Sequence, residues 1–342
     1  MKSLTQQWEE LKKENPHIRI RNAAQKLGVT EVELLATRVG EGVVRLENKA
    51  VEIFKSIASL GRVMVLTRNE ECVHEEKGLF QEVEVMDNNQ LRVNNENINL
   101  RIDLNSISKV FGVTDHSAHG TQQSIQFFDK SGEAIHKIYL TADSNQQTYD
   151  AILEQYRSSD QLSQEAVSEV NKLIKDEKPD VEVDLEGFHS AWKSLESACH
   201  FGKLIESFGL TRIQALRLAP SDYYADKIDN NSIVKMLEEV AKAKVPVVIS
   251  VSNAYVYQTF KGIIRKTMWH QTWYNIMDPD FNLHLDMSKI AATYVVRKPS
   301  NSGTVTSIEA YNEMGELIVH FFSPNAELDT EQSAWREIVG KL

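Results

Sequence analysis

The stretch from Asn99 to Leu104 (NLRIDL) returns 183 positions later (282 − 99) as Asn282 to Met287 (NLHLDM). The same shift aligns Ser124 to Glu133 (SIQFFDKSGE) with Ser307 to Glu316 (SIEAYNEMGE). Four ordered matches with a nearly constant shift indicate a duplicated domain and not a short-period solenoid. The other two are Asn69 to Gly78 with Asn253 to Gly262, shifted by 184 (253 − 69), and Gly28-Val29-Thr30 with Gly209-Leu210-Thr211, shifted by 181 (209 − 28).

Each copy begins with helical patterns and continues into strands. Amphipathic segments open at Trp8 and Trp192, and the Gly-(Val/Leu)-Thr turns at Gly28 and Gly209 should end one helix and cap the next. Turn residues at Asp129 to Gly132 and Asn312 to Gly315 predict hairpins. The expected strands are 63–66, 98–104, 124–128 and 135–140 in the first copy, and 247–251, 282–287, 292–296, 304–311 and 317–322 in the second.

This order of elements predicts the fold class and the domains. Helices followed by many strands in series favour an α+β fold with antiparallel sheets. We expect an N-terminal repeat over 1–157, a partly helical linker over 158–187 and a C-terminal repeat over 188–342. The linker segment is rich in Ser, Gln, Glu, Asp and Lys, and Leu162, Val167, Val170 and Leu173 would allow a short helix in it.

The composition limits the function classes. The net charge of −11 argues against binding nucleic acid or anionic lipid, so an anionic ligand would need a local basic pocket. The chain shows no secretory signal and no apolar run long enough for membrane insertion. Cys72 and Cys199 occupy unmatched positions in the two copies, which is typical of a reducing compartment. We therefore expect a cytoplasmic protein.

Candidate ligand-binding residues are histidines and cations that differ between the copies. His200, expected on the first helix of the second copy, has a side chain that can ligate a metal or haem iron; a surface or core histidine is the alternative. Arg101 stands where the second copy has His284, and could bind an anionic ligand or be a solvated strand residue. His74, matched by Gln258, is a possible accessory ligand, although a place on a surface strand is the simpler reading.

Two further cations could line a pocket in the second copy. Arg212 and Arg217 lie about one helical turn apart and could face one pocket or form a solvent-facing edge. Lys298 ends a strand, where the first copy has Asp115, so it could clamp a carboxylate or lie on the surface. No phosphate loop, dinucleotide fingerprint, nucleophile elbow or CxxC pair is present.

The ordered motifs WEELKKENP, TRNEECVHEEKG, NLRIDL, SIQFFDKSG, RKPSNSGTVTSIE and SAWR resemble the HemS/ChuS/PhuS family of bacterial cytoplasmic haemin-handling proteins. The resemblance runs nearly end to end and includes the duplication. It implies two large stacked β-sheets flanked by helices, with haem b bound on the C-terminal half. It also implies that His200 is the axial iron ligand, that Arg101 lies on the distal side, and that Arg212 and Lys298 lie near the propionates.

The chain departs from the family pattern at three positions. Many members carry Phe where this chain has Asp103, a Tyr where it has Phe322, which cannot donate a hydrogen bond, and a later Arg where it has Asn325. Phe322 is expected to contact haem in place of that tyrosine.

The resemblance leaves enzyme and carrier functions open. As an enzyme of iron acquisition, the chain would open the porphyrin of haemin and release iron, with Arg101 as the catalytic residue and an external electron donor. As a carrier or chaperone, it would deliver haem to a partner or buffer it, with His74 as an accessory stop. The candidate partners are haemin, an inner-membrane haem importer, a reductase and a haem-accepting protein. A scaffold or regulator with a vestigial site is a third class.

Overall fold

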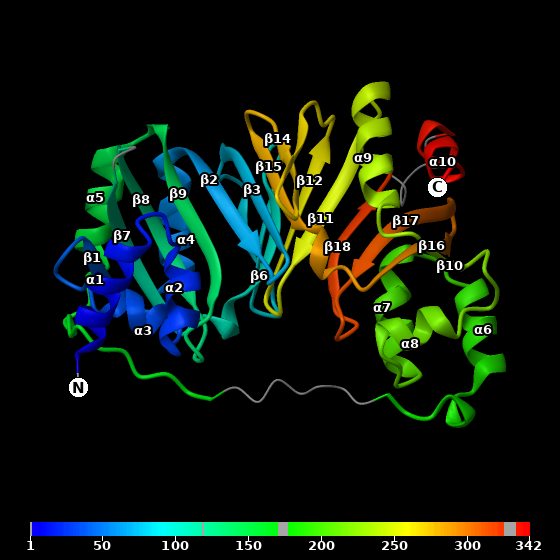
Figure 1. The fold of residues 1–342 in the computed structure, drawn as a ribbon, viewed down its shortest axis with the longest axis horizontal. Helices are drawn as coiled ribbons and strands as arrows, with labels where there is room; N and C mark the ends of the chain where they lie inside the picture. The colour runs from blue at the N-terminus through cyan, green and yellow to red at the C-terminus, as the bar shows by residue number, and fades with distance from the viewer. Residues whose placement is uncertain (1, 118–119, 170–176, 325–332) are drawn as a thin grey trace. The chain divides into compact units, whose positions relative to one another are not determined.

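The computed structural model describes residues 2–117, 120–169, 177–324 and 333–342 (Figure 1). None of the helices in these ranges is long and apolar enough to cross a membrane. The helices are α1 (Leu4–Glu14), α2 (Ile20–Leu27), α3 (Glu31–Ala36), α4 (Ala50–Ile57), α5 (Gln146–Gln155), α6 (Leu185–Lys193), α7 (Phe201–Ser207), α8 (Arg212–Arg217), α9 (Ser232–Ala243) and α10 (Ser333–Val339). Short 3-10 turns are η1 (Ala58–Leu60), η2 (Leu104–Ser106), η3 (Asp180–Glu182), η4 (Ala198–His200) and η5 (Met287–Lys289).

The strands form two large antiparallel sheets, which confirms the predicted α+β class. One sheet has the order β1-β7-β8-β9-β2-β3-β15-β14-β13 and the other β10-β16-β17-β18-β11-β12-β6-β5-β4. The second order is the first with the elements of the two copies exchanged, as a duplication predicts. The strands are β1 (Val43–Leu46), β2 (Gly61–Arg68), β3 (Cys72–Leu79), β4 (Val83–Val85), β5 (Gln90–Asn94), β6 (Asn99–Asp103), β7 (Lys109–Ser117), β8 (Gly120–Phe128), β9 (Ala134–Ser144), β10 (Ala225–Ile228), β11 (Val247–Ser252), β12 (Val256–Gly262), β13 (Thr267–His270), β14 (Trp273–Met277), β15 (Phe281–Asp286), β16 (Ala292–Ser300), β17 (Gly303–Tyr311) and β18 (Leu317–Phe322).

The first compact unit comprises Met1–Thr67, Glu75–Lys172 and Asn253–Tyr257. Helices α2 and α3 pack on one face of its strands, where Val32 and Leu35 meet Phe111 and Phe128, and α1 packs on these two helices through Trp8. Helices α4 and α5 pack on the opposite face. The result is a strand layer between two helical layers, with an apolar core on each side.

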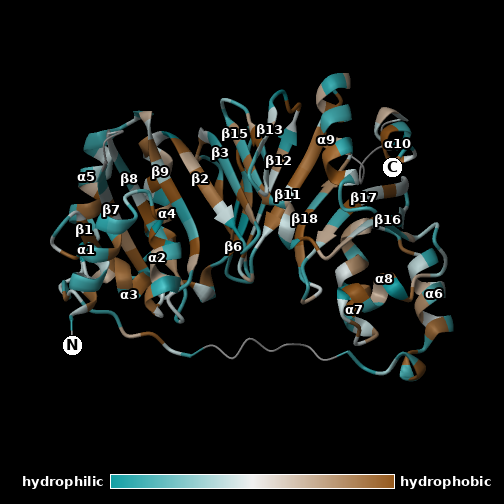
Figure 2. Cartoon of the chain, in the orientation of Figure 1, coloured by the Kyte–Doolittle hydropathy of each residue, from teal (hydrophilic) through white to brown (hydrophobic). Residues whose placement is uncertain are grey.

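The second compact unit comprises Arg68–His74, Leu173–Ser252 and Gln258–Leu342. Helices α6 to α8 cover one face of its strands through Phe188, Trp192 and Phe201. Helices α9 and α10 cover the other face, against strands such as β11. Figure 2 shows β11 as mostly hydrophobic, whereas α9 carries one hydrophobic and one hydrophilic side. Strands with long apolar runs are expected where both faces of a sheet are covered.

Each unit includes a short segment from the other half of the sequence. In the second unit, Asn69 Nδ2 donates to the carbonyls of Ser252 (3.1 Å) and Ile318 (2.7 Å). In the first unit the matching Asn253 donates to the carbonyl of Ile135 (2.9 Å). The linear repeat boundaries therefore differ from the boundaries of the compact units.

The predicted local signals have the predicted geometry. Gly28 and Gly209 take left-handed φ values of 69° and 67° at helix ends, a conformation that glycine adopts without steric penalty. The Thr30 and Thr211 side chains accept the capping hydrogen bonds of α3 and α8. The hairpin turns before β9 and β18 are also confirmed.

The described part of the linker is partly helical, because η3 (Asp180–Glu182) lies in it and α6 begins at Leu185. Residues 158–169, in contrast, contain no helix, and Val170 and Leu173 lie outside the described residues. Arg45 explains part of this difference, because its guanidinium donates to the carbonyls of Leu162 (2.9 Å) and Gln164 (2.8 Å) and pairs with Glu165. Because Arg45 occupies the carbonyls of Leu162 and Gln164, these two carbonyls do not accept the backbone hydrogen bonds of a helix.

Candidate functional site

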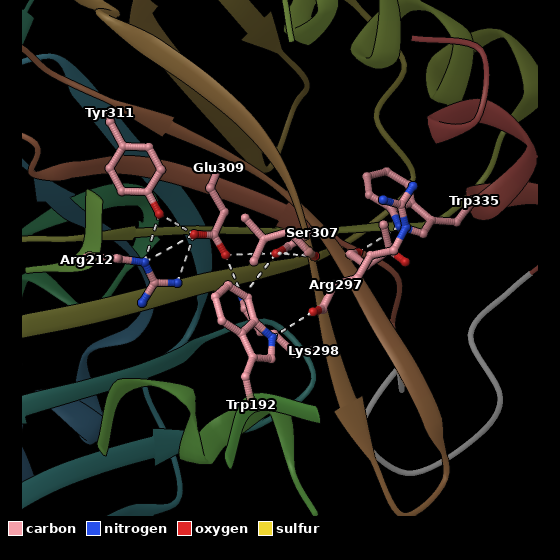
Figure 3. Close-up of polar contacts among 10 residues, drawn as sticks. Trp192, Arg212, Arg297, Lys298, Ser307, Glu309, Tyr311 and Trp335 are labelled. Atoms are coloured by element: carbon pink, nitrogen blue, oxygen red, sulfur yellow. Dashed lines mark hydrogen bonds and ion pairs between the residues drawn. The ribbon is translucent and has the colours of Figure 1, made fainter. Parts of the chain in front are cut away.

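A fully buried carboxylate, Glu309 on β17, forms the centre of a polar cluster in the second unit (Figure 3). Arg212 donates from Nε (3.1 Å) and Nη2 (2.9 Å) to Glu309 Oε2, and from Nε to the Tyr311 hydroxyl (2.8 Å). Tyr311 in turn donates to the same carboxylate oxygen. One oxygen of Glu309 therefore fixes both side chains.

The other oxygen of Glu309 holds Lys298. Lys298 Nζ donates to Glu309 Oε1 (2.5 Å) and to Ser307 Oγ (3.1 Å), and Ser307 donates to Oε1 (2.8 Å). Lys298 is a nearly buried side chain on β16. Two cations share one carboxylate, so the cluster keeps one net positive charge in a chain whose total charge is −11.

The charges in this cluster are stabilised by each other. Burial alone would raise the pKa of Glu309, but Arg212 and Lys298 outweigh burial and hold that pKa well below its ordinary value. Burial and the neighbouring Glu309 raise the pKa of Tyr311 well above its ordinary value, although Arg212 opposes this. At neutral pH the cluster consists of a carboxylate, two cations and a neutral phenol.

The start of α8 explains why Arg212 depends on Glu309. Arg212 is the first residue of the helix after the Thr211 cap. A cation at a helix N-terminus is repelled by the helix dipole, so this position is unfavourable for arginine by itself. The buried carboxylate compensates for that repulsion and aims the guanidinium along the sheet face.

Phe201 connects the cluster to His200. The Arg212 Cζ and Lys298 Nζ atoms lie 5.4 Å and 5.3 Å from the centre of the Phe201 ring, within range of cation–π attraction. The Phe201 ring also packs 4.5 Å from Trp192, whose indole donates to the carbonyl of Arg297 (3.1 Å; Figure 3). The side chain directly after His200 is thus fixed against both cations.

His200 lies at the end of the η4 turn, and its side chain is exposed. The expectation that it lies on the first helix of the second copy is wrong. That helix, α6, ends at Lys193, and Ser197 starts a new turn by accepting a hydrogen bond from the Cys199 N–H (3.2 Å). The chain therefore turns before His200 and presents the imidazole at the start of α7.

Phe322 and His320 lie on the same sheet face as the cluster. The register of β17 and β18 places His320 opposite Glu309 and Phe322 opposite Ser307. The two rings pack edge to face at 5.2 Å. Burial lowers the pKa of His320 to about 3, so its imidazole is neutral at neutral pH. Neither Glu309 nor His320 was predicted from the sequence, and Asn325 lies outside the described residues.

The other predicted residues lie elsewhere. Arg101 is exposed on β6 of the first unit, opposite Arg92, which pairs with Glu84 (2.7 Å). Arg217 pairs with Glu177 and Asp180 rather than with the Arg212 cluster. His74 is fully buried in the second unit with its ring 5.0 Å from Phe281, so its expected place on a surface is wrong.

A comparison of the copies explains how Glu309 could have been found. At the matching positions the first copy has Glu31 for Arg212, Asp115 for Lys298, Gln126 for Glu309, Phe128 for Tyr311 and Lys137 for His320. Glu31 and Lys137 form a buried ion pair, and Gln126 donates to Ser124 (3.0 Å). The acidic and basic residues therefore stand at different matched positions in the two copies. At these positions, only the second copy has two cations on one carboxylate.

The cavity of the first unit does not contribute to this site, and neither does a group of metal-binding side chains. A cavity of about 490 Å³ in the first unit is lined by polar residues that include Asn48, Asp103, Asp129 and Tyr255, and by none of the predicted site residues. Within the described ranges, no three His, Cys, Asp or Glu side chains are grouped to hold a metal ion.

The fold and the site define a class: a protein made of a duplicated α+β unit, whose second copy holds two cations on one buried carboxylate. A sequence profile of the family described as "Haemin-degrading HemS.ChuX domain" matches residues 28–156 and 209–342. The chain is 32% identical to the hemin transport protein HmuS of Yersinia pestis over 99% of this chain and 97% of that protein. The chain therefore belongs to the HemS family.

Solved structures agree with this assignment. Holo-PhuS, a heme-binding protein from Pseudomonas aeruginosa, has a TM-score of 0.94 and 37% identity, covering 98% of each chain. ChuS, described as an E. coli heme oxygenase, has a TM-score of 0.87 and 28% identity, covering 99% of each chain. The relatives thus include a transport protein, a haem-binding protein and an oxygenase.

Proposed function

We propose that this chain binds haemin on the face of its second unit, with His200 as the axial iron ligand. The donor set fits haem. His200 offers an exposed imidazole, the partly exposed Phe322 offers aromatic surface, and Arg212 keeps its side chain 26% exposed while Glu309 holds it. The single observation that supports this proposal most is the cation pair on Glu309, placed directly beside the start of α7.

Arg212 and Lys298 are proposed to attract the propionates. A carboxylate approaching Arg212 meets a guanidinium that is already oriented, so little side-chain entropy is lost on binding. Lys298 is nearly buried and contributes its charge mainly through the field of the cluster. Haem is here the cargo or the substrate, with haem b as its natural form.

We further propose that the bound haem is degraded with electrons from an external donor. Bound haem itself supplies the redox chemistry. Arg101, an exposed guanidinium of the first unit, is assigned as the catalytic residue that stabilises charge on the distal side. The carrier function is the second candidate, and the exposure of His200 favours it, because an accessible ligand can pass haem to an accepting protein. A fully buried His74 suits neither function without local opening. We also propose the cytoplasm as the compartment.

The test is the absorption spectrum of the haemin-loaded protein before and after a reductant is added in air, with catalase present to remove free peroxide. Decay of the Soret band with release of chelatable iron supports the enzyme. A ferrous spectrum that stays stable in air, and again without air, supports the carrier function.

Three variants separate the assigned functions. His200→Ala should remove the axial-ligand signature, whereas the exposed His17→Ala serves as the matched control and should keep it. Arg101→Ala should keep binding and lose degradation. An unchanged spectrum in His200→Ala would refute the assigned ligand.

A further inference from the structure

Two short strands end the sheets and lie at matching places in the two copies. Among the described strands, β13 pairs only with β14, and β4 pairs only with β5. The outer edge of a terminal strand presents backbone donors and acceptors that can pair with another chain. Both edges are therefore possible interaction surfaces.

Exposed apolar side chains gather at these two edges. Within the described residues, six of the twelve large apolar side chains that are exposed belong to the hairpins that carry β4 and β13 or to their approach. Trp269 is 48% exposed and Met268 43%, both on β13 (labelled in Figure 2). Natural edge strands are usually protected by charges, bulges or proline, so apolar edges of this kind favour a partner. The six are Leu79, Val85, Met86, Met268, Trp269 and Met277.

The two edges carry opposite charges. Beside β4, the exposed side chains include Glu82, Glu84 and Asp87. Glu84 also pairs with Arg92 of β5 (2.7 Å), so Glu82 and Asp87 carry most of the acidic charge of this edge. Beside β13, Arg265 and Lys266 are exposed, and their backbone N–H groups are held by the buried carboxylate of Asp278 (3.0–3.1 Å). The backbone of both basic residues is thus fixed, and their side chains are exposed to solvent. An acidic apolar edge and a basic apolar edge are mutually complementary.

We propose that the β4 edge of one molecule pairs with the β13 edge of a second copy of this chain. An unrelated partner would require only one such edge, whereas complementarity between two edges of the same chain favours self-association. The net charge of −11 makes copies repel each other in general, so the contact depends on this local match. Strand pairing supplies hydrogen bonds, and the charges set which edges meet.

The experiment measures mass by sedimentation equilibrium over a range of protein concentrations. The wild-type chain should show mass above the 38.9 kDa of one chain, increasing with concentration. Arg265→Glu with Lys266→Glu makes both edges acidic, and Glu82→Lys with Glu84→Lys makes both edges basic. Each double variant should sediment at the mass of one chain.

A mixture of the two double variants should associate again, because acidic edges then meet basic ones. Lys26→Glu with Lys55→Glu, two exposed lysines on α2 and α4, changes the net charge as much as the β13 reversal and should leave association unchanged. Met268→Gln removes an exposed apolar side chain of β13 without changing any charge, and it should weaken association.

Three results would overturn the proposal. The wild-type chain could keep the mass of one chain at every concentration, the double variants could associate like wild type, or the mixture could fail to associate although each variant is folded by circular dichroism. In the last case the two edges do not pair with each other.

Discussion

At the scale of single residues, Glu309 shows how one buried carboxylate organises a binding face. It accepts hydrogen bonds from Arg212, Lys298, Ser307 and Tyr311. The matching Gln126 of the first copy carries no charge, and that copy has no cation pair of this kind at the matched positions. All three positions differ between the copies, because the first copy has Glu31 and Asp115 in place of the two cations.

Glu309→Gln should lower the free energy of unfolding by about 3–5 kcal/mol, because it leaves the nearly buried Lys298 without its counter-charge. Urea unfolding at neutral pH measures this loss, and the exposed Glu313→Gln is the matched control. A loss as small as that of the control would contradict the buried ion-pair assignment.

The pH dependence of the same comparison gives a second readout. The pKa of folded Glu309 is depressed, so its stabilisation is fully present above its ordinary value of 4.5 and is lost as the pH falls through the folded pKa. The stability difference between wild type and Glu309→Gln should therefore shrink in acid.

His320→Gln should reduce the loss of stability on acidification. In wild type the folded state keeps His320 neutral down to a pKa of about 3, while the unfolded chain takes up a proton near 6.5. Wild-type stability therefore falls as the pH falls from about 6.5 toward 3, and the glutamine variant lacks this contribution. The free energies of unfolding of wild type and His320→Gln, measured at several pH values, should therefore converge as the pH falls. Parallel pH profiles would mean that His320 is not desolvated.

At the scale of elements, the β17–β18 hairpin and α8 support each other. A Cβ added at Gly315 would lie 2.9 Å from Ile213 Cγ2 of α8, next to Arg212. The matching Gly132 of the first copy lies against Val32 of α3 and against Thr30, the residue that caps α3, in the same way. A turn glycine thus allows close packing between hairpin and helix in both copies.

Gly315→Ala should displace α8, lower stability by about 1–3 kcal/mol and weaken haemin binding, since Arg212 begins that helix. Gly303→Ala is the matched control, because Gly303 also has a positive φ (133°) but no atom within 4 Å of an added Cβ. Haemin titration and thermal unfolding measure the two effects. Equal effects of both variants on binding would exclude the displacement of α8.

At the scale of the whole molecule, the halves of the sequence exchange short segments. Asn69 belongs to the first half by sequence but hydrogen-bonds within the second unit, and Asn253 does the reverse. The Asn69 side-chain oxygen also accepts the N–H groups of Glu71 (3.2 Å) and Cys72 (2.8 Å). Each asparagine fixes the exchanged segment in its unit.

Asn69→Ala should increase amide hydrogen exchange in β11 and β18, because the lost donor leaves the carbonyls of Ser252 and Ile318 without that bond. Asn253→Ala should instead act near Ile135 in β9. Exchange measured by mass spectrometry distinguishes the two patterns. The exchange of segments would be contradicted if Asn69→Ala increased exchange in the first unit and Asn253→Ala increased it in the second unit.

Local signals in the sequence were sufficient for the duplication, the α+β class, the hairpins and the capped helix pairs. Glycine at a helix end, threonine at a cap and alternating apolar residues act over a few positions, so they can be recognised without tertiary information. The resemblance of ordered motifs also gave the family. Strands such as β13 and β14 were missed, because burial does not alternate along them: β13 is mostly exposed, whereas three consecutive residues of β14 are buried.

The sequence by itself determined the repeat, the fold class and which cations differ between the copies. Only the tertiary structure decided that Arg212 and Lys298 meet on Glu309, that Arg217 pairs elsewhere, that His74 is buried and that His200 follows a separate turn. Residues 212, 298 and 309 come together through strand register and helix packing across about a hundred positions. Such long-range contacts depend on the whole fold, whereas helix caps and turns depend on neighbouring residues alone.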